Sequence, residues 1–104
     1  MQQLLFVIVF LTTPVFAETP TAARQEALRE LLLEDCGSCH GMTLKGGLGP
    51  SLVSSRLQPY QDQFLIETIL EGRPGTPMPA WKTLLGRDEA AWIVQELRRR
   101  PDPS

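Results

Sequence analysis

Several residue types are scarce in this chain of 104 residues, and each scarcity excludes a class of protein. One histidine and two cysteines are too few for a structural zinc site, which normally takes about four Cys or His ligands. Ten Lys and Arg against twelve Asp and Glu give a net charge of −2, so the basic excess of a nucleic-acid binder is missing. With 42% hydrophobic residues the chain is too apolar to be disordered, and its length allows one domain.

A long hydrophobic run is missing too, because the apolar stretch Leu4–Leu11 is shorter than the ~20 residues that span a bilayer. This stretch is typical of a secretory signal peptide, and Val-Phe-Ala at 15–17 has the small residues that signal peptidase accepts. We therefore expect cleavage after Ala17, which leaves 18–104 as the mature domain in the periplasm, without stable membrane insertion. The alternative is an uncleaved amphiphilic anchor.

Helical periodicity recurs in three segments, and no segment alternates as a half-buried strand would. We expect helices over 22–35, from about 58 to a stop at Gly72, and from about Arg87 to Arg99. Residues 41–59 are rich in Gly and Pro, which predicts a long loop that wraps something. The sequence therefore predicts an all-α fold of three short helices. Such a fold buries too little apolar surface on its own, so a bound group is expected to complete the core.

Each predicted helix has apolar side chains at helical spacing that we expect to be buried. In chain order these are Leu28, Leu31 and Leu32, then Phe64, Leu65, Ile69 and Leu70, then Trp92, Ile93 and Leu97.

The two cysteines and the single histidine stand together as Cys36-Gly37-Ser38-Cys39-His40. This C-x-x-C-H motif is the attachment signature of haem c: the thiols add to the porphyrin vinyl groups and the histidine binds the iron. A thioredoxin-like redox pair, an ordinary disulfide and chance are the alternatives. The redox pair lacks its βαβ context, and a disulfide leaves the place of the only histidine unexplained. We expect one covalently attached haem c, with its iron, as cofactor.

A second axial ligand has to come from far along the chain to reach the opposite face of the ring. Met42 and Met78 are the methionines outside the signal peptide, and Met42 lies too close to His40 to cross the haem plane. Met78 stands between Pro77 and Pro79, which stiffen its backbone, and its soft thioether suits haem iron. We expect His40 and Met78 to be the metal ligands.

These blocks resemble the class I c-type cytochromes, which are small monohaem electron carriers. The likeness covers nearly the whole mature chain: a helix leading into C-x-x-C-H, then Gly47–Leu52, then Gly72–Trp81, then a C-terminal helix. It implies a cytochrome c fold around one haem, with the carbonyl of Pro50 accepting a hydrogen bond from the ring of His40. The block Arg73–Trp81 also resembles the small periplasmic cytochrome encoded beside cytochrome cd-type nitrite reductase in denitrifying bacteria.

One position departs from this class. Its first and last helices usually cross where a small residue meets an aromatic one, whereas Leu28 and Glu96 fall near those places here. We expect Trp92, one turn before Glu96, to cover the crossing instead.

The resemblance implies a monomeric electron carrier of the periplasm, not an enzyme, whose partners are redox proteins such as cytochrome cd-type nitrite reductase. Docking is expected at an apolar haem edge with weak electrostatic steering, since the basic cluster Arg98–Arg100 is typical of helix-dipole compensation. Two alternatives stay open. One is a haem enzyme or ligand sensor with an open sixth iron position, and the other is an accessory factor for reductase maturation.

Overall fold

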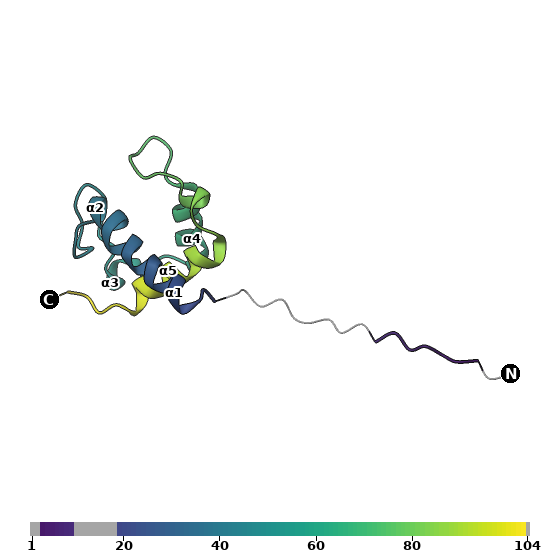
Figure 1. Ribbon diagram of the computed structural model, residues 1–104. Coiled ribbons are helices and arrows are strands. Elements are labelled where there is room, and N and C mark those ends of the chain that lie inside the picture. The colour runs from purple at the N-terminus through teal and green to yellow at the C-terminus, as the bar shows by residue number, and fades with distance from the viewer. Residues whose placement is uncertain (1–2, 10–18, 104) are drawn as a thin grey trace.

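The computed structural model describes residues 3–9 and 19–103, and within them all regular elements are helical, as the all-α prediction requires. Figure 1 shows their arrangement. In chain order they are α1 (Ala22–Leu31), a π-helical turn η1 (Leu32–Cys36), α2 (Gly37–His40), α3 (Ser54–Leu57), α4 (Asp62–Glu71), a 3-10 turn η2 (Trp81–Thr83) and α5 (Arg87–Arg99).

The predicted signal peptide is described only in part. Residues 3–9 have no regular secondary structure, and their apolar side chains are exposed, Leu5 at 90%. The rest of the apolar run and the expected cleavage point after Ala17 lie outside the described residues. Among the described helices, none is long and apolar enough to cross a membrane.

The first helix is longer than predicted. It begins behind Thr21, whose hydroxyl oxygen accepts a hydrogen bond from the Arg24 N–H at 3.2 Å. The predicted end at Cys36-Gly37 is wrong, because the helical run continues through η1 and α2 to His40. Gly37 has a helical φ of −60° and does not interrupt the run, whereas Gly41 ends it with a φ of 92°.

The other boundaries agree with the sequence to different degrees. The predicted loop 41–59 contains the short helix α3, which seats the buried side chain of Leu57. The second helix was expected from about 58 and begins at Asp62, but it ends before Gly72 as predicted. Helix α5 has the predicted bounds, and the Glu89 carboxylate accepts from the Gly86 N–H at its start, at 3.0 Å.

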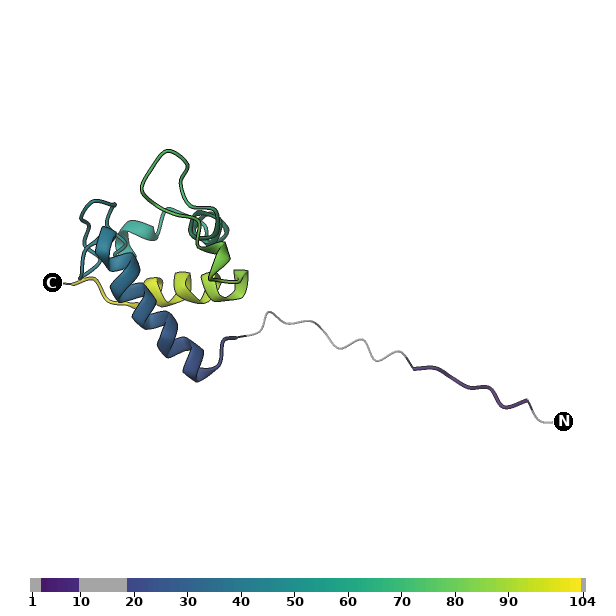
Figure 2. The same cartoon turned by 45° about the horizontal axis from the view of Figure 1, so that its top comes forward.

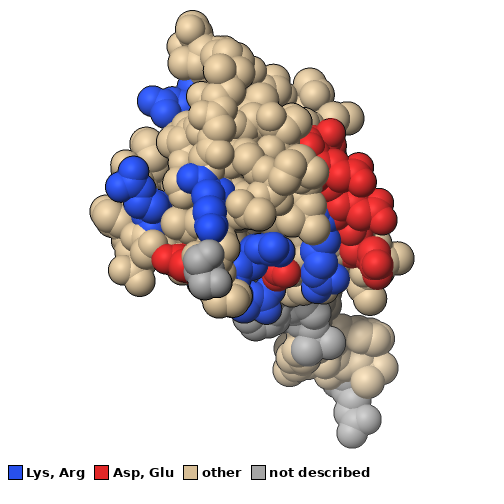
Figure 3. Space-filling model, turned by 90° about the vertical axis from the view of Figure 1, so that its left-hand side faces the viewer, with Lys and Arg blue, Asp and Glu red and all other residues tan. Residues whose placement is uncertain are grey.

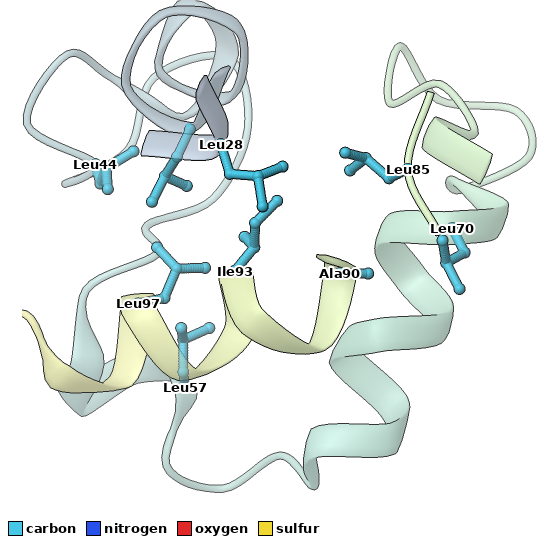
Figure 4. Packing of buried hydrophobic residues seen from close by; sticks show 9 residues of the cluster. Leu28, Leu44, Leu57, Leu70, Leu85, Ala90, Ile93 and Leu97 are labelled. Carbon is cyan, nitrogen blue, oxygen red and sulfur yellow. The ribbon is translucent and has the colours of Figure 1, made fainter. Parts of the chain in front are cut away.

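The buried hydrophobic cluster joins all the main helices. Figure 4 shows Leu28, Ile93 and Leu85 pointing into the same interior region. The cluster consists of Leu28, Leu32, Leu44, Leu57, Leu70, Leu85, Ala90, Ile93 and Leu97. Five of the side chains predicted to be buried are not fully buried: Phe64 is 55% exposed, where its ring stacks on Tyr60, and the other four are half-buried, namely Leu31, Leu65, Ile69 and Trp92.

Helix α1 crosses α5, as both ribbon views show (Figures 1 and 2). The Arg29 guanidinium lies over the Trp92 ring, 5.3 Å from its centroid, and pairs with Glu96 at 3.4 Å. Leu28 is fully buried next to it. Trp92 therefore takes part in the crossing, as expected, but as a half-buried ring under an arginine rather than as core. This crossing fixes the direction in which the first helix presents the C-x-x-C-H motif.

Candidate functional site

The π turn sets how the C-x-x-C-H motif faces the core. In an α-helix the N–H of Cys36 would bond to the Leu32 carbonyl, four residues before it, and the two side chains would share a face. In the wider π turn the N–H of Gly37 bonds to the Leu32 carbonyl instead, so Gly37 takes that place on the face. Gly37 is accordingly buried, while Cys36 and Cys39 are half-buried. The turn thus places a residue without a side chain against the core and moves both thiols to its margin, where a planar group can reach them.

The two cysteines are free thiols in this structure. The pKa of the Cys36 thiol is raised to about 11, mainly by burial and to a smaller extent by the Asp35 carboxylate and Cys39. Redox-active pairs of the thioredoxin kind depend on a lowered thiol pKa, because the thiolate is the reactive form. The environment of Cys36 is the opposite of that, which argues against a thioredoxin-like pair.

The imidazole of His40 is held by the loop that follows α2. Its Nδ1 lies 2.7 Å from the carbonyl oxygen of Pro50. A carbonyl can only accept, so Nδ1 carries the proton and donates, which leaves the Nε2 lone pair available for a metal. The contact that the resemblance implied for Pro50 is therefore present, and it selects the tautomer that a haem ligand needs.

Gly49 contributes to the same arrangement, and sequence reasoning missed it. A Cβ on Gly49 would lie 2.8 Å from Cε1 and 2.9 Å from Nδ1 of His40, closer than real Cβ atoms approach. The Gly49 N–H donates to the Cys39 carbonyl at 2.8 Å, and the Gly46 N–H donates to the His40 carbonyl at 2.8 Å. The loop is thus bound to the motif's own backbone and presses on the ring. The position of Gly49 next to Pro50 was the available signal.

Met78 lies on a separate loop between α4 and η2, and its side chain is half-buried. Figures 1 and 2 show α2 on one side of the molecule and this loop on the other, both above α5. Met42, the rival methionine, is 72% exposed next to the motif. The structure therefore brings Cys36, Cys39 and His40 together on one helical segment and supplies Met78 from a different element.

The surroundings of these residues are apolar. Half-buried side chains pack against the buried cluster from α4, from the loop after α2 and from η2: Leu52, Leu65, Ile66, Ile69 and Trp81. The described residues include no buried polar or charged side chain and no group of three His, Cys, Asp or Glu that could hold a metal ion alone. A nitrogen donor, a thioether and two thiols in an apolar setting are the donor set for a haem c, so the residues present fit that group.

Comparison with known proteins agrees with this chemistry. The model of a family described as cytochrome C oxidase, cbb3-type, subunit III matches residues 23–95. The chain belongs to this cytochrome c family. Membership implies covalently bound haem c with iron, and the family is one of electron carriers rather than a class of enzymes. The fold prediction and the suspected resemblance are both confirmed at this level.

Individual relatives show which cytochromes within this family the chain is similar to. Cytochrome c55X of Pseudomonas aeruginosa is 54% identical over 80 residues, which are 77% of this chain and 67% of that protein. The solved structure of the c-type cytochrome NirC has a TM-score of 0.74 at 53% identity and covers 76% of this chain and 93% of that one. A dihydro-heme d1 dehydrogenase structure has a TM-score of 0.64 at 32% identity, and the likeness spans 16% of its chain.

Proposed function

We propose that this chain is a periplasmic electron carrier in denitrification, with cytochrome cd-type nitrite reductase as the partner that receives its electrons. The observation that carries the proposal is the C-x-x-C-H motif at the end of a helix, with His40 oriented by Pro50 at 2.7 Å. The likeness to cytochrome c55X and NirC supports the assignment to this group of small cytochromes.

In this proposal each site residue has one role. Cys36 and Cys39 would hold the haem through thioether bonds, and His40 Nε2 and the Met78 sulfur would bind its iron. When bound, haem c supplies a one-electron couple between ferric and ferrous iron. The chain orients the two ligands, keeps water away with its apolar side chains, and raises the reduction potential because an apolar setting disfavours the extra positive charge of ferric iron.

Residues 1–17 act as a cleaved signal peptide in this proposal, and 18–104 form the mature monomeric domain. The support is the short apolar run and the Val-Phe-Ala triplet at 15–17. Mass spectrometry of protein from the periplasmic fraction checks it, since cleavage predicts an amino terminus at Glu18. An intact amino terminus in the membrane fraction would favour the uncleaved anchor.

Docking uses the face over α2 and the loop after it. Figure 3 views the molecule from this side: the upper part of the face is mostly uncharged, whereas Lys and Arg side chains lie across its central and lower part and an acidic patch lies at the right. Met42 and Leu48 are exposed there, at 72% and 80%. Two of the three arginines at the end of α5 are engaged within the chain instead, because Arg98 pairs with Asp62 at 2.7 Å and Arg99 pairs with Glu96 at 2.5 Å.

The test is the rate of electron transfer from the reduced protein to purified cytochrome cd-type nitrite reductase, measured by stopped flow over a range of ionic strength. We expect fast transfer that slows only modestly with salt, because few charges face the partner. Arg100→Glu is the control, since Arg100 is exposed and has no ion pair among the described residues. A steep salt dependence that this variant alters would place the docking surface on α5. If no electrons are transferred, this reductase is not the partner.

The likeness to dihydro-heme d1 dehydrogenase favours one second candidate, an accessory role in reductase maturation. That role predicts electron exchange with this kind of dehydrogenase rather than with the finished reductase. The same stopped-flow measurement separates the two functions when each purified enzyme is offered in turn. Exchange with the dehydrogenase alone would replace the carrier proposal by the accessory one.

A further inference from the structure

The loop that carries Met78 closes at its base through a glycine. Gly72 follows α4 with φ 68° and ψ −166°, a backbone conformation that residues with a side chain avoid. A Cβ on Gly72 would lie 2.6 Å from the carbonyl carbon of Pro79 and 2.8 Å from the nitrogen of Ala80. Both are backbone atoms that cannot rotate away, so only glycine lets the two ends of the loop meet this closely.

Hydrogen bonds inside the loop hold Met78 on both sides. The Arg73 N–H donates to the Met78 carbonyl at 3.3 Å, directly beside the contact of Gly72 with Pro79. The Thr76 hydroxyl donates to the Arg73 carbonyl at 2.6 Å and accepts from the Met78 N–H at 3.3 Å. The backbone before and after Met78 is therefore tied to the start of the loop, and its position depends on how tightly the base is closed.

From this geometry we propose that Gly72 is a positioning residue for Met78, because its contact with Pro79 closes the loop and sets how far the thioether reaches toward the iron. The inference rests on the proposed ligation by Met78. A side chain at position 72 displaces Pro79, the next residue after Met78, and breaks the adjoining hydrogen bond. The thioether then withdraws, and the sixth iron position becomes open to an added ligand.

The loop contains its own matched control. Gly75 also has a positive φ, of 79°, but a Cβ on it would meet nothing within 4 Å. Gly75→Ala therefore adds the same methyl group to the same loop and carries backbone strain from positive φ without touching the base. A difference between Gly72→Ala and Gly75→Ala measures the closure rather than general loop strain.

The experiment titrates ferric holo-protein with imidazole and measures the reduction potential, with covalent haem and helix content checked in parallel. For Gly72→Ala we expect imidazole to bind at least about tenfold more tightly than to wild type, and the potential to fall, with covalent haem retained. For Gly75→Ala we expect an affinity within about twofold of wild type. Equal affinities in the two variants would overturn the inference.

Two further variants test the role of the loop if Gly72→Ala does not fold and separate that role from ligation. Thr76→Val removes an exposed hydroxyl that ties Met78 to Arg73, the residue after Gly72, so it tests whether the start of the loop positions Met78 if Gly72→Ala yields no folded holo-protein: tighter imidazole binding supports the inference, and wild-type affinity overturns it. Met78→Ala separates this inference from the proposed function. If Met78→Ala opens the iron while the closure variants behave as wild type, ligation stands and the positioning role falls.

Discussion

The two sides of the site are built differently. On the histidine side the proposed ligand His40 is the last residue of the C-x-x-C-H motif, its ring contacts the Pro50 carbonyl at 2.7 Å, and the neighbouring loop is bonded to the motif's backbone. On the methionine side a loop of exposed residues holds a half-buried Met78 through contacts at its base. The histidine is therefore held by a neighbouring loop bonded to its own helix, whereas Met78 is held within an exposed loop, so we expect a perturbation to release Met78, the second proposed ligand, first.

The largest effect is expected from removing the attachment itself. Replacing Cys36 and Cys39 with Ser should abolish covalent haem and leave an unfolded chain, because the helices alone bury too little apolar surface. Circular dichroism and haem staining of the purified protein check this. A folded, helical protein without haem would show that the helices need no prosthetic group. The segments that carry His40 and Met78 would then both fold without haem.

Removing the methionine should open one side and leave the other intact. For Met78→Ala we expect covalent haem to persist while added imidazole binds about a hundredfold more tightly or more and the potential falls. Met42→Ala is the control, because Met42 is exposed beside the motif and should leave both quantities unchanged. A potential and an imidazole affinity like those of wild type in Met78→Ala would exclude it as the ligand.

A smaller effect is expected on the histidine side from Gly49→Ala. The added methyl group would overlap the imidazole ring, so we expect a loss of about 1 to 2 kcal/mol in stability and an altered ferric electron paramagnetic resonance spectrum. Gly37→Ala is the control, since its Cβ would make only ordinary contacts, the nearest at 3.8 Å. An unchanged spectrum in Gly49→Ala would mean that Pro50 alone orients the ring.

The smallest effect is expected at the ion pair that joins helices α1 and α5. Arg24 of α1 donates a hydrogen bond to the Glu89 carboxylate of α5, and the Gly86 N–H donates a second one. These bonds, the Arg24 bond most strongly, lower the pKa of Glu89 below its usual value of about 4.5. A lowered folded-state pKa adds stability above the unfolded pKa, and that stability is lost as pH falls through the folded value.

Glu89→Gln should therefore cost about 1 kcal/mol or less at pH 7, and the deficit should shrink below about pH 4.5. Chemical denaturation at several pH values measures it. Glu26→Gln serves as the control, because Glu26 is exposed and makes no ion pair among the described residues. A deficit in Glu89→Gln that stays constant down to acid pH would assign its stabilising role to packing instead of charge.

Local chemistry made some of this structure predictable. Helix α5 follows from its apolar stripe and from acids and bases at the ends that suit the dipole, and the end of α4 follows from Gly72. The π turn was missed because a reading at α-helical spacing assumes an even repeat through Cys36. Helix α3 was missed because four residues carry too little periodicity.

The candidate site divides in the same way. The C-x-x-C-H motif and Met78 can be recognised from the sequence, because the residues that identify each of them are adjacent in the chain. The roles of Gly49 and Gly72 cannot, because each depends on a close approach to backbone or ring atoms of another segment, which appears only in three dimensions. A glycine beside Pro50 and a glycine that ends a helix look like ordinary turn residues until their neighbours are known.

We propose that His40 and Met78 both bind the haem iron. The absorption spectrum of purified wild-type protein in both oxidation states tests it most directly. We predict six-coordinate low-spin iron in both states and, in the ferric state, a far-red sulfur-to-iron band that disappears in Met78→Ala. A high-spin ferric spectrum, or a low-spin one without that band in wild type, would contradict the claim and leave the sixth position to another ligand.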